Sequence, residues 1–180
     1  KMGGQKGIAL FYKSFSRICD VTLISTTNNS KPDDFSGQFL PVLSKSVLRY
    51  INPFLFFTIR NILKKNKSTH LILEHPYYGW LGFLLKKITG IKLVIHSHNI
   101  EAMRFKSTGK WWWRIMYAYE KWAHGCADVN FFISDEDKSY AIDKYKLSSD
   151  KCTTITYGFD LNSPPSPDEK KVAKQILCER

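Results

Sequence analysis

The chain has 180 residues, of which 43% are hydrophobic, and this favours one globular domain with a buried core over a disordered chain. Its formal net charge of +11 predicts attraction to anions, whether phosphorylated small molecules, anionic lipid surfaces or nucleic acid. No apolar run approaches the length of a transmembrane helix, no signal peptide is recognisable, and the cysteines form no pair or cluster at metal-ligand spacing.

Helical and strand patterns alternate along the first half of the chain. The expected elements are a loop at 3–7, a helix at 8–18, a strand at 20–25, a polar loop at 26–37, a short strand at 39–43 weakened by Pro41, and a helical segment at 45–67. Within the last segment, Asn52 is the expected N-cap and Pro53 the first helical residue of its second part.

The same alternation continues through the second half. The expected elements are a strand centred on 71–73, a helix at 77–89 closed by Gly90, a strand at 93–95, a long helix at 110–126, a strand at 129–133 capped by Ser134, and a strand at 153–156. Such alternation predicts an α/β fold, with a Rossmann-like parallel sheet covered by helices on both faces.

Proline and serine mark the end of this unit. Residues 162–168 contain three prolines and two serines, a composition typical of a linker. We therefore expect one domain at 1–161, a linker at 162–168 and the start of a following element or domain at 169–180. Because the sequence opens on Lys1, we also expect it to be part of a longer protein.

The stretch from Lys92 to Arg104 is the most informative part of the sequence. A buried strand leads directly into His96, His98 and Asn99, followed by Glu101 and Arg104. Ligands of open α/β sheets bind beyond the carboxyl ends of the strands, which is where these polar groups should lie. The cluster therefore predicts one wall of a small-molecule site.

Each residue of this wall also has a structural interpretation. His96 and His98 should point to the same side of the strand, with His96 the better candidate for a structural histidine and His98 for a ligand-facing donor. Glu101 and Arg104 could simply pair on a helical turn. His75 opens onto the same crevice, or only ends its strand before Pro76.

Other features are open to both structural and functional interpretations. Gly3 and Gly4 before a helix could form a phosphate-binding loop or a tight turn. Glu120, in a tryptophan-rich helix, is expected to be a structural residue that braces a neighbouring loop. In that helix, Trp112, Ile115, Met116, Tyr119 and Trp122 are spaced to share a face, and at least one ring of the 111–113 tryptophan triplet should be exposed.

Two basic, aromatic segments are candidates for contact with a membrane surface. Lysines and arginines flank Phe54, Phe56 and Phe57 within 45–67, and others flank the tryptophan triplet. A solvated basic face over a packed core is the simpler interpretation of each segment, and a helix lying on a membrane surface is the alternative.

The motifs occur in an order that resembles a known family. A Gly-Gly pair opening a helix precedes His-Ser-His-Asn-Ile-Glu-Ala-Met-Arg, Tyr-Glu-Lys-Trp-Ala-His-Gly-Cys-Ala-Asp, Phe-Phe-Ile-Ser-Asp-Glu-Asp and Thr-Ile-Thr-Tyr-Gly-Phe-Asp. From Gly3 to about Asn162, this series resembles the N-terminal domain of family 4 glycosyltransferases, which have a two-domain GT-B architecture. Where the family has Pro-Asn-Gly, this chain has Tyr157 before Gly158, a departure near the hinge.

The resemblance implies a retaining, metal-independent transfer of a sugar from a nucleotide-sugar to a glycan or lipid-linked acceptor, with no other cofactor. His98 matches the catalytic histidine that faces the transferred sugar. Gly3 and Gly4 match the glycine loop near the donor phosphates or acceptor, and His75, Asn99, Glu101 and Arg104 would line the acceptor side. The implied enzyme is a hexosyltransferase of polysaccharide biosynthesis. It is expected to be cytoplasmic, with the inner face of the membrane as a candidate location.

The resemblance also implies two parts that the sequence lacks. A first strand, expected ahead of Gly3 near the centre of the sheet, would come from upstream residues or another chain. The donor-binding C-terminal domain is absent too, so we expect the fragment alone to be inactive. The alternative function is a non-catalytic module that binds anions or membrane surfaces. Nucleic-acid binding is not expected, because no helix-turn-helix, RRM or KH pattern appears.

Overall fold

The computed structural model describes residues 3–156 and 166–178 and shows a mixed α/β protein. Its helices are α1 (Gly3–Phe15), α2 (Leu55–Lys65), α3 (Gly79–Thr89), α4 (Glu101–Ser107), α5 (Trp113–Cys126), α6 (Asp135–Tyr145) and α7 (Pro167–Cys178). Its strands are β1 (Thr22–Thr26), β2 (Gln38–Leu43), β3 (His70–Glu74), β4 (Lys92–Ser97), β5 (Val129–Phe132) and β6 (Cys152–Thr154). Short 3-10 helices are η1 (Val47–Ile51), η2 (Pro76–Tyr78) and η3 (Ser149–Lys151).

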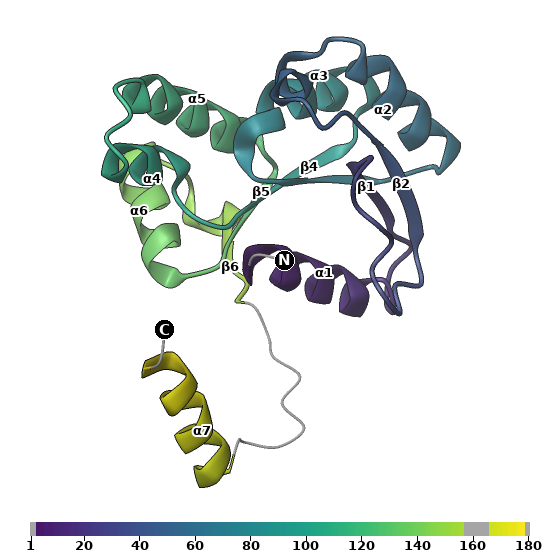
Figure 1. The fold of residues 1–180 in the computed structure, drawn as a ribbon. Coiled ribbons are helices and arrows are strands. Elements are labelled where there is room, and N and C mark those ends of the chain that lie inside the picture. The colour runs from purple at the N-terminus through teal and green to yellow at the C-terminus, as the bar shows by residue number, and fades with distance from the viewer. Residues whose placement is uncertain (1–2, 157–165, 179–180) are drawn as a thin grey trace.

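All strand pairs are parallel, but the strands form two sheets (Figure 1). Strands β3, β4, β5 and β6 are neighbours in that order, and β1 pairs only with β2 among the described strands. Figure 1 shows α1 on the opposite side of the strands from α2 and α3. Parallel sheets flanked by helices confirm the predicted Rossmann-like class, with the difference that the sheet is divided between β1 and β3.

No backbone hydrogen bonds pair the two sheets among the described strands, and hydrophobic packing by α2 and α3 links them instead. Leu55, Ile59 and Leu63 of α2 are buried against Leu81 and Leu85 of α3, and partly buried side chains of β1 and β2 pack on the same cluster. The spacing of four residues between the buried positions of α2 places them on one helical face. This hydrophobic cluster connects the small sheet to the large one.

Several sequence predictions of local structure are confirmed. Gly90 has a φ of 72° and ends α3, because glycine adopts this left-handed conformation without the steric cost of a Cβ. Ser134 caps α6, its side chain accepting a hydrogen bond from the Asp137 N–H. Pro41 is tolerated in β2, which lies at the edge of its sheet.

Other boundaries differ from the predictions. Helix α1 begins at Gly3, so the glycine pair forms its first turn and not a loop. Helix α2 begins at Leu55, since Asn52 caps the preceding turn by accepting a hydrogen bond from the Phe54 N–H. Helix α7 begins at Pro167, within the predicted linker, and residues 162–165 of that linker lie outside the described part.

The face predicted for α5 is only partly buried. The residues that α5 buries are Met116, Glu120, Ala123 and His124, whereas Ile115 and Trp122 remain 66% and 41% exposed. The polar members can be buried because they are hydrogen-bonded within the core. The exposed tryptophan expected in the triplet is Trp111, which is 83% exposed.

Among the described residues, we find no helix with the length and hydrophobicity needed to cross a bilayer.

Candidate functional site

The ends of β3 and β4 bring the polar residues together. The two strands are parallel, with Glu74 opposite His96 in the register. Because parallel strands end at the same edge of a sheet, His75 and His98, which follow these strands, lie at that edge as well. The ring centroids of His75 and His98 are 4.4 Å apart, so the crevice neighbours expected from the sequence do meet.

Glu74 is the centre of a first hydrogen-bond network. Its Oε1 accepts a hydrogen bond from the Tyr12 hydroxyl at 2.5 Å and lies 3.2 Å from His96 Nδ1. Its Oε2 lies 2.5 Å from His98 Nε2. A carboxylate only accepts hydrogen bonds, so both histidines must present a protonated nitrogen to Glu74. The carboxylate thereby sets the tautomer and orientation of both rings.

The charge states in this network follow from burial and hydrogen bonding. Burial favours the protonated form of Glu74, but hydrogen bonds from His96, His98 and Tyr12 outweigh it and lower the pKa of Glu74 to about 2. Burial lowers the pKa of His98, against the opposing effect of the Glu74 carboxylate. His98 is therefore a neutral imidazole at neutral pH, with its proton on Nε2 and an acceptor at Nδ1.

His75 has an unusual backbone. Its φ of 72° and ψ of 157° lie in a region that non-glycine residues seldom adopt, at a cost on the order of 1–3 kcal/mol. The conformation is held by a 3.0 Å hydrogen bond from the His75 N–H to the His96 carbonyl. Strain of this kind is concentrated at functional sites. It places the His75 ring beside His98, with Nδ1 3.2 Å from Glu101 Oε1.

Glu101 is the centre of a second network, which His75 connects to the first. Glu101 is 1% exposed and accepts hydrogen bonds from the Tyr77 hydroxyl at 2.7 Å, from Asn99 Nδ2 at 3.0 Å and from Arg104 Nε at 2.7 Å. Burial favours protonation, but the hydrogen bonds from His75, Tyr77 and Arg104 lower the pKa of Glu101 to about 2. The expected pairing of Glu101 with Arg104 is confirmed, and it is part of a larger network.

Glu120 supports this second network by binding the backbone at the start of α4. Its Oε1 accepts a hydrogen bond from the Glu101 N–H at 2.9 Å, and its Oε2 accepts one from the Ala102 N–H and one from the Tyr145 hydroxyl, both at 2.8 Å. Glu120 therefore satisfies the otherwise unpaired amides at the start of α4. The predicted structural role, a buried acceptor that braces a neighbouring segment, is confirmed.

A metal ion is the alternative occupant of the first network. Glu74, His96 and His98 each offer a ligand atom, and these atoms lie within 4.8 Å of one another. Two histidines and a glutamate are a ligand set typical of zinc. In the present arrangement, however, both histidines point protonated nitrogens at Glu74, and binding would require them to change tautomer. We therefore interpret the cluster as a hydrogen-bonded network.

A hollow of about 500 Å³ borders the second network. It lies between α4 and α6 and is lined by Asn99, Ile100, Met103, Arg104, Ser107, Glu136, Asp137 and Tyr140. The side chain of Arg104 is 47% exposed, in contrast to the buried Glu101 that holds it. The guanidinium is thus an oriented cation at the edge of a space large enough for a sugar-sized ligand.

Helix α1 begins with the glycine pair but contacts the site through residues further along the helix. Helix α1 reaches the first network through Tyr12, which lies about 13 Å from Gly3 along the helix axis. The ring of Phe11 also packs on His96, with centroids 5.2 Å apart. Binding of phosphate or acceptor by Gly3 and Gly4 stays a prediction.

Sequence reasoning missed Glu74, Tyr77 and Tyr12. Glu74 was visible only as the last residue of a strand, and its importance comes from the register that sets it opposite His96. Tyr77 contributes a hydroxyl to both Glu101 and Arg104. The available signal was the position of these polar residues in the sequence: Glu74 ends a strand, and His75 and Tyr77 follow it closely.

Comparison with known proteins agrees with this architecture. The sequence model of Glycosyltransferase Family 4 matches residues 12–163. The chain belongs to this family. The match confirms the expected relationship and is consistent with the N-terminal domain of such an enzyme. No curated protein sequence matches the chain.

Proposed function

We propose that this family 4 domain is the acceptor-binding half of a retaining glycosyltransferase. It would transfer a hexose from a nucleotide-sugar to a glycan or lipid-linked acceptor, in polysaccharide biosynthesis at the cytoplasmic side of a membrane. The observation that carries the proposal is the pair of connected networks at the carboxyl edge of β3 and β4. These buried polar groups satisfy one another by hydrogen bonds, and they lie at the edge of the sheet where ligands of α/β proteins bind.

His98 is the proposed catalytic residue. Glu74 keeps a proton on Nε2 and thereby fixes the orientation of the ring, which we propose faces the transferred sugar. Because burial favours the neutral ring, His98 would not add a positive charge next to the positively charged transition state of glycosyl transfer.

The acceptor side is assigned to the second network. Arg104 is held by Glu101 and exposed to the hollow, where its guanidinium can bind acceptor hydroxyls or phosphate. Asn99 and His75 flank it, and Gly3 and Gly4 would approach the donor phosphates. In this proposal the nucleotide-sugar is the substrate, no metal takes part, and the fragment alone does not turn over, because donor binding belongs to the C-terminal domain.

The test is His98→Ala in the full-length enzyme. We expect turnover to fall at least about 100-fold with an unchanged circular dichroism spectrum, a loss in the range reported for a positioned catalytic group. His70→Ala is the matched control, since His70 is an exposed histidine at the start of β3. Adding EDTA should leave wild-type turnover unchanged. Unaltered turnover of His98→Ala would remove His98 from the mechanism.

A non-catalytic module that binds anions or membrane surfaces is the competing function. The net charge and the exposed aromatics fit this module as well as they fit a transferase. The buried Glu74 and Glu101 networks favour the transferase, because binding to a charged surface does not require histidines held in one tautomer. A full-length protein that binds vesicles and turns over no nucleotide-sugar would favour the module.

A further inference from the structure

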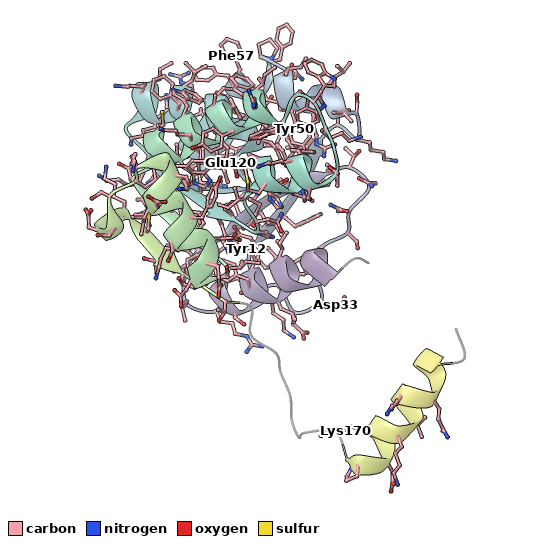
Figure 2. All side chains as sticks on the ribbon, turned by 90° about the vertical axis from the view of Figure 1, so that its left-hand side faces the viewer. Tyr12, Asp33, Tyr50, Phe57, Glu120 and Lys170 are labelled. Carbon is pink, nitrogen blue, oxygen red and sulfur yellow. The ribbon has the colours of Figure 1, made fainter. Side chains whose placement is uncertain are left out.

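The 3-10 helix η1 and the start of α2 carry a large apolar surface. Its five members, which we call the η1–α2 face, are Val47, Leu48, Ile51, Phe54 and Phe57, with exposed fractions of 76%, 68%, 72%, 74% and 61%. Figure 2 shows Phe57 at the outer surface of the molecule. Several exposed large apolar side chains this close together in the sequence indicate an interaction site, because water penalises their exposure.

This exposure is not explained by packing within the domain. Helix α2 already buries Leu55, Ile59 and Leu63 toward α3, so its inward face is complete. Phe57, Arg60 and Lys64 follow one another at spacings of three and four residues and share the outward face. The exposed face of this segment thus combines apolar side chains at its start with cationic side chains further along α2, and exposed aromatics beside Lys and Arg are typical of surfaces that bind anionic membranes.

The charge around the face identifies the chemistry of the partner. Residues 35–73 contain six lysines and arginines and no aspartate or glutamate. The six are Lys45, Arg49, Arg60, Lys64, Lys65 and Lys67. A segment with this composition attracts a negatively charged surface, because each basic residue close to an anionic bilayer adds to the attraction. The five apolar side chains offer nothing for a nucleic acid to hydrogen-bond, but they match the acyl region of a bilayer.

We propose that the η1–α2 face docks on an anionic phospholipid membrane. In this arrangement Phe54, Phe57 and Ile51 enter the interface, while Lys45, Arg60 and Lys64 contact the phosphate headgroups. Neither α2 nor any other described helix crosses the bilayer.

The face is coupled to the candidate site. The ring of Tyr50, in η1, packs against the ring of Tyr77 with centroids 5.2 Å apart, and its carbonyl accepts a 2.6 Å hydrogen bond from Trp80 Nε1. Tyr77 in turn donates to Glu101. Tyr50 and Tyr77 therefore connect η1 with the Glu101 network. If the transferase proposal holds, a bilayer bound at η1 would present the sugar of a lipid-linked acceptor to this network.

Vesicle flotation with the full-length protein tests the proposal. We expect binding to vesicles of phosphatidylglycerol and phosphatidylcholine, little binding to phosphatidylcholine alone, and weakening between ~0.1 M and ~0.5 M NaCl, where screening shortens the reach of charges. Phe54→Ser with Phe57→Ser should lower the partition coefficient at least about tenfold. Because both side chains are exposed, the circular dichroism spectrum should not change.

The matched control is Trp111→Ser with Ile115→Ser. These side chains are 83% and 66% exposed and lie next to Lys110 and Arg114, so they form a second apolar and basic surface on another element. The control should bind like the wild type. Loss of binding in the control alone would overturn the proposal, as would equal binding to neutral vesicles or undiminished binding of the Phe54 and Phe57 variant.

Self-association is the remaining alternative for the face. If the wild type ignores vesicles and forms dimers that the Phe54 and Phe57 variant lacks in sedimentation, the face binds protein and the proposal is wrong. Flotation contains no nucleotide-sugar, so its failure concerns this face only. An enzyme that binds vesicles but shows no turnover would instead count against the proposed transferase function.

Discussion

The substitution Glu74→Gln tests whether the first network depends on a charged acceptor. Glutamine has nearly the shape of glutamate, but its amide nitrogen donates where the carboxylate accepted. Both Glu74 oxygens face donors, Tyr12 and His96 on one side and His98 on the other. Either orientation of the amide therefore sets an N–H group against a donor, and His98 is no longer held in one tautomer.

The size of the effect follows from the pKa of Glu74. A fall from the ordinary value of 4.5 to about 2 means that the folded protein favours the ionised form by about 3 kcal/mol. The side chain is 21% exposed, and screening by solvent reduces the expected loss to about 2 kcal/mol. Urea unfolding of the full chain at neutral pH, followed by circular dichroism, measures this loss.

The stabilising contribution of Glu74 should decrease as the pH falls. Because the pKa is lower in the folded state, the contribution of Glu74 is fully present above about pH 4.5 and is lost as the pH falls toward about 2. The stabilities of wild type and Glu74→Gln should therefore converge in acid. Glu136→Gln, at an exposed position of α6, is the control and should change stability by less than about 0.5 kcal/mol. If Glu74→Gln behaved like Glu136→Gln, the reasoning would be refuted.

Two further predictions concern the buried groups of α5. Glu120→Ala leaves two amides of α4 and the Tyr145 hydroxyl without their acceptor and should cost about 2–4 kcal/mol, against about 1 kcal/mol for Tyr145→Phe, both read from urea unfolding; equal losses would contradict this account. Burial lowers the pKa of His124 to about 4 from 6.5, so its contribution is complete above pH 6.5, and about 2 kcal/mol of stability should be lost between pH 7 and pH 5. NMR titration checks this, and a His124 that titrates near 6.5 would disprove it.

Features set by local chemistry could be predicted from the sequence. Gly90 and Ser134 act within one helical turn of themselves, and both were placed correctly. The alternation of strands and helices predicted the fold class. The polar residues at the end of β4 predicted one wall of a site, and the structure places His98 of this wall beside His75.

Features set by distant contacts could not be predicted. Helix α4 has seven residues, and the side chain that satisfies its first amides lies on α5, so the local pattern gave no signal for it. The importance of Glu74 depends on strand register in the same way. On α5, the large apolar residues marked only part of the buried face, because burial of Glu120 and His124 is possible only with partners from other elements.

The division of the strands into two sheets has a mechanical consequence. No ladder of backbone hydrogen bonds joins β1 to β3 within the described residues, so the small sheet is held to the large one mainly by the packing of α2 and α3. Side-chain packing is less directional than a ladder, and we expect it to allow more relative movement of the two sheets. Since Phe57 lies on α2 and His98 follows β4 of the large sheet, such movement would change the distance between these two residues.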